Sequence, residues 1–154
     1  MKGKRRLWII LSVIGVIILG FYREFIFVHI NEQLFALWYD EPSRASDRIP
    51  FLKSTDYYTL YYAKWFLTVF FAALFYVAIV GVLKVIFNAN YWKELGVIYG
   101  VLTVGAIIAM GLGYVTNSVE DLYIIARFLM GIAQSPLLLM IMIPGIMLRK
   151  SLRA

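Results

Sequence analysis

Apolar residues in this chain gather into four long segments that are separated by short polar stretches. A helix needs about 20 mostly apolar residues to cross roughly 30 Å of hydrocarbon, and each of the four segments is this long. They cover residues 7–30, 57–87, 95–115 and 119–148. The pattern therefore predicts an all-α integral membrane protein, a four-helix bundle made by a single transmembrane domain over residues 1–154.

The polar stretches between the segments contain residue types that usually begin or end helices. Ser54, Thr55 and Asp56 are all favoured N-cap types and come directly before the second segment. Residues 88–90, Asn-Ala-Asn, separate the second segment from the third. Ser118 and Asp121 have the spacing of a capping box before the last segment. These signals predict helix boundaries inside the connections.

The longest and most polar connection covers residues 40–56 and contains Pro42 and Pro50, which cannot lie inside a continuous helix. Helix-compatible sequence continues past the first apolar segment to about Tyr39. The second segment is also longer than a span requires, because 31 residues make a helix of about 46 Å. We expect this part of the chain to cap the bundle, either dipping into lipid headgroups or docking a partner.

Lys and Arg residues are concentrated on one side of the predicted bundle. The two chain ends and the connection between the second and third segments carry nine basic residues and one acidic residue, whereas the opposite side carries six basic and eight acidic residues. Basic residues flanking membrane spans favour the cytoplasmic side. The asymmetry predicts a multi-pass protein with both termini inside (N-in/C-in) and the 40–56 loop outside. We interpret the first segment as an uncleaved anchor, because no small-residue cleavage site follows it.

Ionisable residues within the segments gather near the predicted outer end. Such residues are costly in lipid and usually have partners. We predict that Arg127 of the last segment forms an ion pair with Glu24 or Glu32 of the first; the alternative is that its side chain extends to the outer headgroups. The predicted polar cluster consists of Arg23, Glu24, His29, Glu32, Lys64, Arg127 and Gln134.

Small residues and prolines mark the predicted packing of the last two segments. Glycine or alanine recurs along the third segment at spacings that allow helix backbones to approach closely, at Gly96, Gly100, Gly105, Ala109 and Gly113. This face predicts packing within the bundle or docking against another membrane subunit. Pro136 lies in the middle of the last segment and predicts a kink, and Pro144 lies near its inner end.

The chain is 62% hydrophobic and contains no cysteine and one histidine. Zinc normally takes three or four protein ligands, and thiol chemistry needs cysteine. The sequence also lacks a nucleophile elbow, a phosphate-binding loop and the zinc-protease motif. We therefore predict no metal, no cofactor and no catalytic residue, and we favour a non-enzymatic protein over an intramembrane enzyme. The net charge of +6 lies mainly at the ends of the spans, so it does not indicate nucleic acid.

Several residues of the last segment follow an order that is seen in one known family: Ala126-Arg127-Phe128-Leu129, then Gln134, Pro136-Leu137-Leu138-Leu139 and Pro144. This order resembles the exosortase F system-associated four-helix membrane proteins of Bacteroidetes. The Arg-Glu-Phe run at residues 23–25, followed by an outer loop, is similar to their first segment. The resemblance implies a non-enzymatic accessory protein of the bacterial inner (cytoplasmic) membrane.

Together these features predict an accessory or structural subunit of an inner-membrane protein complex. Its expected partners are the lipid bilayer and other integral membrane subunits, or further copies of the same chain. Docking would use the small-residue helix faces and the outer loop. The alternative is a small lipid-handling membrane enzyme, or a transporter component, that uses the outer polar cluster.

Overall fold

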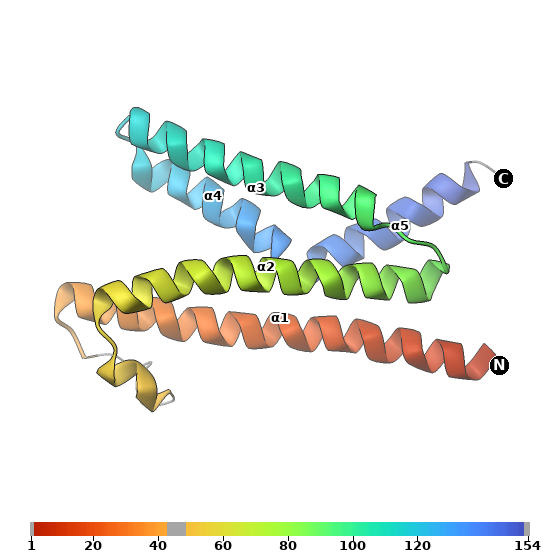
Figure 1. Ribbon diagram of the computed structural model, residues 1–154, viewed down its shortest axis with the longest axis horizontal. Helices are drawn as coiled ribbons and strands as arrows, with labels where there is room; N and C mark the ends of the chain where they lie inside the picture. The colour runs from red at the N-terminus through yellow and green to blue at the C-terminus, as the bar shows by residue number, and fades with distance from the viewer. Residues whose placement is uncertain (1, 43–48, 153–154) are drawn as a thin grey trace.

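The computed structural model describes residues 2–42 and 49–152, and its regular elements are all helices (Figure 1). The elements are α1 (Lys2–Tyr39), the 3₁₀ helix η2 (Pro50–Ser54), α2 (Tyr57–Phe87), α3 (Trp92–Val115), α4 (Val119–Ala133) and α5 (Leu137–Ser151). The predicted all-α class is confirmed. Helices α1, α2 and α3 are each long and apolar enough to cross a membrane, and α4 with α5 makes a fourth if the bent pair is one span. Residues 43–48 of the predicted loop lie outside the described residues.

The helices are arranged as two antiparallel pairs. Helix α1 packs along α2, helix α3 packs along α4, and α2 also contacts α3, α4 and α5. Both chain termini and the α2–α3 connection lie at one end of the molecule, which we call the terminal end (Figure 1). The η2 helix and the α3–α4 turn lie at the opposite end, which we call the loop end (Figure 1).

Asparagine and aspartate residues mark the ends of the first three α-helices. Asp40, Asn88 and Asn117 are the non-glycine residues with positive φ in the described parts of the chain, at 55°, 51° and 54°. Their short polar side chains tolerate this left-handed conformation better than most residue types do. Each helix therefore stops where its sequence offers a residue that can turn the chain.

The helix starts follow the predicted capping signals only in part. Of the three candidates Ser54, Thr55 and Asp56, Asp56 is the cap of α2, and its carboxylate accepts a hydrogen bond of 3.0 Å from the backbone N–H of Thr59. Ser118 occupies the N-cap position of α4, but its hydroxyl donates to the carbonyl of Thr116 and caps no N–H. The capping box predicted for Ser118 and Asp121 is therefore wrong, because this side chain bonds within the preceding turn.

The loop end has its own small core. Helix α1 continues nine residues beyond the predicted end of the first span, to Tyr39. Leu34 of this extension and Ile30 just before it pack with Leu60 of α2 and with Leu52 of η2, which is only 2% exposed. The described part of the loop is therefore folded onto the helices.

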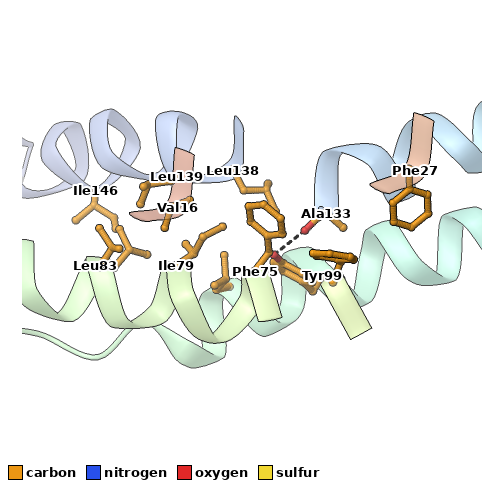
Figure 2. Packing of buried hydrophobic residues seen from close by; sticks show 13 residues of the cluster. Val16, Phe27, Phe75, Ile79, Leu83, Tyr99, Ala133, Leu138, Leu139 and Ile146 are labelled. Atoms are coloured by element: carbon orange, nitrogen blue, oxygen red, sulfur yellow. Dashed lines mark hydrogen bonds between the residues drawn. The ribbon is translucent and has the colours of Figure 1, made fainter. Parts of the chain in front are cut away.

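The main core lies where α5 packs against α2. Phe75, Ile79 and Leu83 of α2 are fully buried, and Leu138 and Ile146 of α5 lie against the same cluster (Figure 2). Outside this core, the long helices expose many large apolar side chains over most of their length. A water-soluble protein rarely exposes contiguous apolar surface of this extent. The exterior of the helices is therefore suited to hydrocarbon.

The predicted fourth span is not one helix, because α4 ends at Ala133 and α5 begins at Leu137 with a bend of 62° between them. This break coincides with Pro136, whose nitrogen has no hydrogen to donate along the helix. The freed carbonyls find other donors. The Tyr99 hydroxyl donates to the Ala133 carbonyl at 2.8 Å (Figure 2). The Ser135 hydroxyl donates to the Ile132 carbonyl at 3.0 Å. Pro144, in contrast, lies inside α5 without ending it.

Candidate functional site

An open cleft of about 1020 Å³ lies between the α1/α2 pair and the α3/α4 pair, in the half of the molecule toward the loop end. Its walls come from residues 23–31 of α1, 61–69 of α2, 103–110 of α3 and 123–137 at and beyond α4. We call it the inter-hairpin cleft. Its volume matches the upper end of ordinary ligand pockets, which measure about 300–1,000 Å³.

Five of the seven predicted cluster residues line this cleft, namely Arg23, Glu24, Lys64, Arg127 and Gln134. The other two do not. His29 is buried, and its Nδ1–H donates to the carbonyl of Phe25 at 2.8 Å, while Glu32 is exposed outside the cleft lining. The α1 lining of the cleft ends at Asn31, one residue before Glu32, and the His29 ring is occupied by the carbonyl of Phe25.

Arg23 is held by three interactions within the cleft. Its Nε donates to the side-chain oxygen of Gln134 at 3.2 Å, and its Nη1 forms an ion pair of 2.6 Å with Glu24. Its guanidinium carbon also lies 4.6 Å from the centre of the Phe27 ring, a cation–π arrangement. The positive charge of Arg23 is thus matched by its neighbour, and the side chain is only 19% exposed.

Gln134 ties the end of α4 to both helices of the other pair. Its side-chain oxygen accepts from Arg23 of α1, and its side-chain nitrogen donates to the carbonyl of Thr68 in α2 at 2.9 Å. Its backbone N–H donates to the carbonyl of Met130 at 3.1 Å. Gln134 is 1% exposed and both ends of its side-chain amide are hydrogen-bonded, so its role is to connect the helices that form the cleft.

The predicted ion pair between Arg127 and α1 is not formed. Glu24 bonds to Arg23 instead, Glu32 lies outside the cleft lining, and no described acid pairs with Arg127, which is exposed toward the cleft. Arg23 is adjacent to Glu24 on α1, so it reaches the carboxylate without bridging the cleft, whereas Arg127 would have to reach across from α4.

Lys64 of α2 bridges the cleft wall to α4. Its ammonium donates to the hydroxyl of Tyr123 at 3.3 Å. Tyr123 and Arg127 are four residues apart on α4, so they are neighbours on one helix face. The contact therefore places Lys64 and Arg127 along the same stretch of wall.

The small-residue face of α3 is mostly used inside the chain. A Cβ atom added at Gly105 would lie 3.2 Å from a methyl group of Leu129, and one added at Gly113 would lie 3.2 Å from the Cα of Val119. Ala109 packs in the same α3–α4 cluster. Gly96 has only the Tyr76 hydroxyl nearby, at 3.5 Å, and Gly100 has nothing within 4 Å.

Three residues that matter to this architecture were not singled out from the sequence: Thr68, Tyr99 and Tyr123. Tyr99 and Tyr123 carry hydroxyls within apolar helices, where a polar group needs a hydrogen-bond partner. Thr68 contributes its backbone carbonyl, which accepts from Gln134, while its hydroxyl donates to the Lys64 carbonyl of the same helix. A search for isolated hydroxyl residues in the middle of the apolar segments would have found Tyr99, but it would not have identified its partner on another helix.

Among residues 2–42 and 49–152, no three His, Asp or Glu side chains are close enough together to hold a metal ion. The fold and the cleft define a class: a helical protein with several membrane-length apolar helices and a cleft between two helix pairs that holds a small cationic cluster. No protein-family model, curated protein or solved structure matches this chain.

Proposed function

We propose that this chain is a multi-pass protein of the bacterial cytoplasmic membrane that binds a lipid-like amphiphile in the inter-hairpin cleft. Both termini lie on the cytoplasmic side, and binding involves no covalent chemistry. The observation that carries the proposal is the cleft itself. It combines a ligand-sized volume with walls of apolar and aromatic side chains and one group of charged residues.

The distribution of groups in the cleft suits a molecule with a polar head and an apolar tail. The charged side chains come from α1, α2 and α4, while α3 contributes mainly apolar residues such as Ile107 and Met110. Trp65 and Tyr61 add amphipathic rings from α2. In a bilayer such a cleft fills with lipid or with part of another membrane molecule, because empty space of this size loses dispersion contacts on every side.

A cleft-filling substitution tests the proposal. Gly131 lines the cleft, and a Cβ atom added there would have nothing within 4 Å, so the backbone has room for the larger side chain of Gly131→Phe at the cleft wall. Gly111→Phe is the matched control, because Gly111 is equally open but lies outside the cleft lining. The readout is crosslinking by a lipid that carries a photoreactive group in its acyl chain.

We expect the wild-type protein to be labelled at cleft residues, with several-fold less labelling in Gly131→Phe and no change in Gly111→Phe. Labelling spread evenly over the outer faces of the helices, and equal in the two variants, would contradict binding in the cleft.

A second candidate is the accessory-subunit function, in which α3 docks another membrane protein. It is favoured by Gly100, which is exposed and has nothing within 4 Å of its Cβ position, so a neighbouring helix has room to approach. Purification in a gentle detergent followed by mass measurement tests it. We expect a complex larger than the monomer that Gly100→Leu dissociates; a monomer in both samples would dismiss this function.

A further inference from the structure

The inter-hairpin cleft carries more positive than negative charge. Three cationic side chains line it, those of Arg23, Lys64 and Arg127, and one carboxylate, that of Glu24, lines it with them. Three positive charges and one negative charge leave a net charge of +2 among the ionisable lining groups. Uncompensated charge beside apolar walls is costly in a membrane, so it indicates an anionic counterpart.

The excess charge belongs to Lys64 and Arg127. Glu24 compensates Arg23 through the 2.6 Å ion pair, and Arg23 is further committed to Gln134. Lys64 uses one of its three donors on the neutral Tyr123 hydroxyl and keeps its charge. Arg127 is exposed toward the cleft, and no described residue bonds its guanidinium.

These two cations lie on neighbouring parts of the cleft wall. The Lys64 ammonium touches Tyr123, which lies one helical turn from Arg127 on the same face of α4. An arginine offers a planar fork that matches two oxygens of a phosphate, and a lysine adds a mobile point charge. Apolar and aromatic side chains continue from this point along α2 and α3.

We infer that the cleft selects an anionic phospholipid, with its phosphate between Lys64 and Arg127 and its acyl chains along the apolar walls. This inference rests on the proposed amphiphile binding and specifies the ligand's headgroup. Arg23 and Gln134 do not contact the phosphate; they hold the helix pairs at the separation that the lipid needs. Basic residues that merely extend to the headgroup region also attract anionic lipids. The inference therefore requires that the preference depend on Lys64 and Arg127 and not on a basic residue outside the cleft.

The test compares lipids that share the same acyl chains. The full-length protein in detergent is titrated with phosphatidylglycerol, phosphatidylcholine, diacylglycerol and inorganic phosphate, and bound lipid is counted by native mass spectrometry. We expect phosphatidylglycerol to bind about tenfold or more tightly than diacylglycerol, because each charge-assisted hydrogen bond adds affinity. Phosphatidylcholine should lie between them.

Variants assign the effect to the two residues. Lys64→Met and Arg127→Met each remove a charge and keep an apolar stem, so each should reduce the preference for phosphatidylglycerol, and the double variant should abolish it. Arg127→Lys should restore part of the preference. Arg149→Met is the matched control, because Arg149 is an exposed basic residue in the last turn of α5, outside the cleft lining.

The possible outcomes separate the two proposals. If no amphiphile labels or binds the cleft, the proposed function fails. If amphiphiles bind but phosphatidylglycerol and diacylglycerol bind equally, only the headgroup inference is overturned. If inorganic phosphate competes as well as the lipid does, the site recognises a free anion and the phospholipid assignment is wrong.

Discussion

Side-chain hydrogen bonds make it possible for the helix to break between α4 and α5 in apolar surroundings. At the α4–α5 junction, hydroxyl groups of Tyr99 and Ser135 replace the backbone donors that Pro136 and the bend remove. Lipid offers no hydrogen bonds, so each freed carbonyl must find a donor within the protein. Gln134 completes the junction by bonding groups of α1 and α2. The backbone carbonyls freed at the bend are therefore hydrogen-bonded within the protein.

The first prediction concerns the Tyr99 hydroxyl. Tyr99→Phe removes the buried 2.8 Å hydrogen bond and leaves the Ala133 carbonyl without that donor. An unsatisfied buried acceptor costs about 1–3 kcal/mol, so we expect the free energy of unfolding in mixed micelles to fall by this amount. Tyr76→Phe is the control, because the Tyr76 hydroxyl bonds the Trp92 carbonyl at an exposed site. Equal losses in the two variants would argue against a special role for Tyr99.

The second prediction concerns the pH dependence of the α2 cap. Hydrogen bonding from the Thr59 side chain, and then from its backbone N–H, lowers the pKa of Asp56 below its ordinary value. A lowered pKa in the folded state means that the carboxylate stabilises the fold above the ordinary pKa and that this stabilisation is lost as pH falls through the folded value.

Asp56→Asn keeps a good cap that does not titrate. We therefore expect the melting temperature of the wild type, relative to Asp56→Asn, to decline on acidification from about pH 5 toward about pH 3, around the ordinary carboxyl range of about 4. If the melting temperatures of the two proteins change equally with pH across this range, the titration of Asp56 does not affect stability.

At the scale of helices, small residues set which pairs pack closely. Gly105 and Gly113 bring α3 against α4, and a Cβ at Gly20 of α1 would lie 3.1 Å from the Pro136 ring. Backbones approach closely only where side chains are absent, and dispersion contacts then replace the missing hydrophobic effect between helices in lipid. These glycines are thus part of the internal packing of the chain.

The third prediction compares two glycines on α3. A Cβ at Gly113 meets the Val119 backbone at 3.2 Å and the Leu122 Cβ at 3.1 Å, whereas Gly111 has nothing within 4 Å. Gly113→Ala should lower the free energy of unfolding by about 1–3 kcal/mol through overpacking. Gly111→Ala should leave it unchanged or raise it by up to about 1 kcal/mol through helix propensity. Unfolding in mixed micelles measures both, and destabilisation by Gly111→Ala alone would reverse the assignment of faces.

The whole molecule has two ends of different charge. The terminal end carries most of the basic residues, and the loop end carries most of the acidic ones. If the charge asymmetry sets the direction of insertion, the terminal end faces the cytoplasm and the cationic cluster of the cleft lies toward the outer leaflet. Under this orientation the proposed lipid would enter from the outer leaflet.

The fourth prediction tests this orientation in intact cells. The chain contains no cysteine, so single substitutions report without background. We expect cysteines at Ser54 and Ser118, at the loop end, to react with a membrane-impermeant thiol reagent from outside, and cysteines at Lys4 and Ser151 to react only after lysis. Labelling of Ser151→Cys in intact cells would contradict an even number of spans with both termini inside.

The helical class and most helix boundaries can be read from the amino-acid sequence alone. Runs of apolar residues are a local property. The N-cap Asp56, which bonds the backbone three residues later, is also local, and so are Asn88 and Asn117, which adopt the left-handed conformation that ends a helix. The break near Pro136 was visible for the same reason, because a missing N–H is a property of one residue. The split of the last span into two helices with a 62° bend was not predicted, because neighbouring helices decide whether a kink becomes a break.

The partners of the polar side chains were decided only by the tertiary structure. The sequence identified Arg127, Glu24 and Gln134 as one cluster, but helix periodicity cannot say how far apart two hairpins lie. Glu24 reached the nearer cation, Arg23, and Gln134 bonded groups on two other helices. Arg127 was left facing an open cleft, since α4 diverges from α1 beyond the junction. Such pairings depend on distances between segments far apart in the chain, and those distances follow from the packing of the glycines and the core.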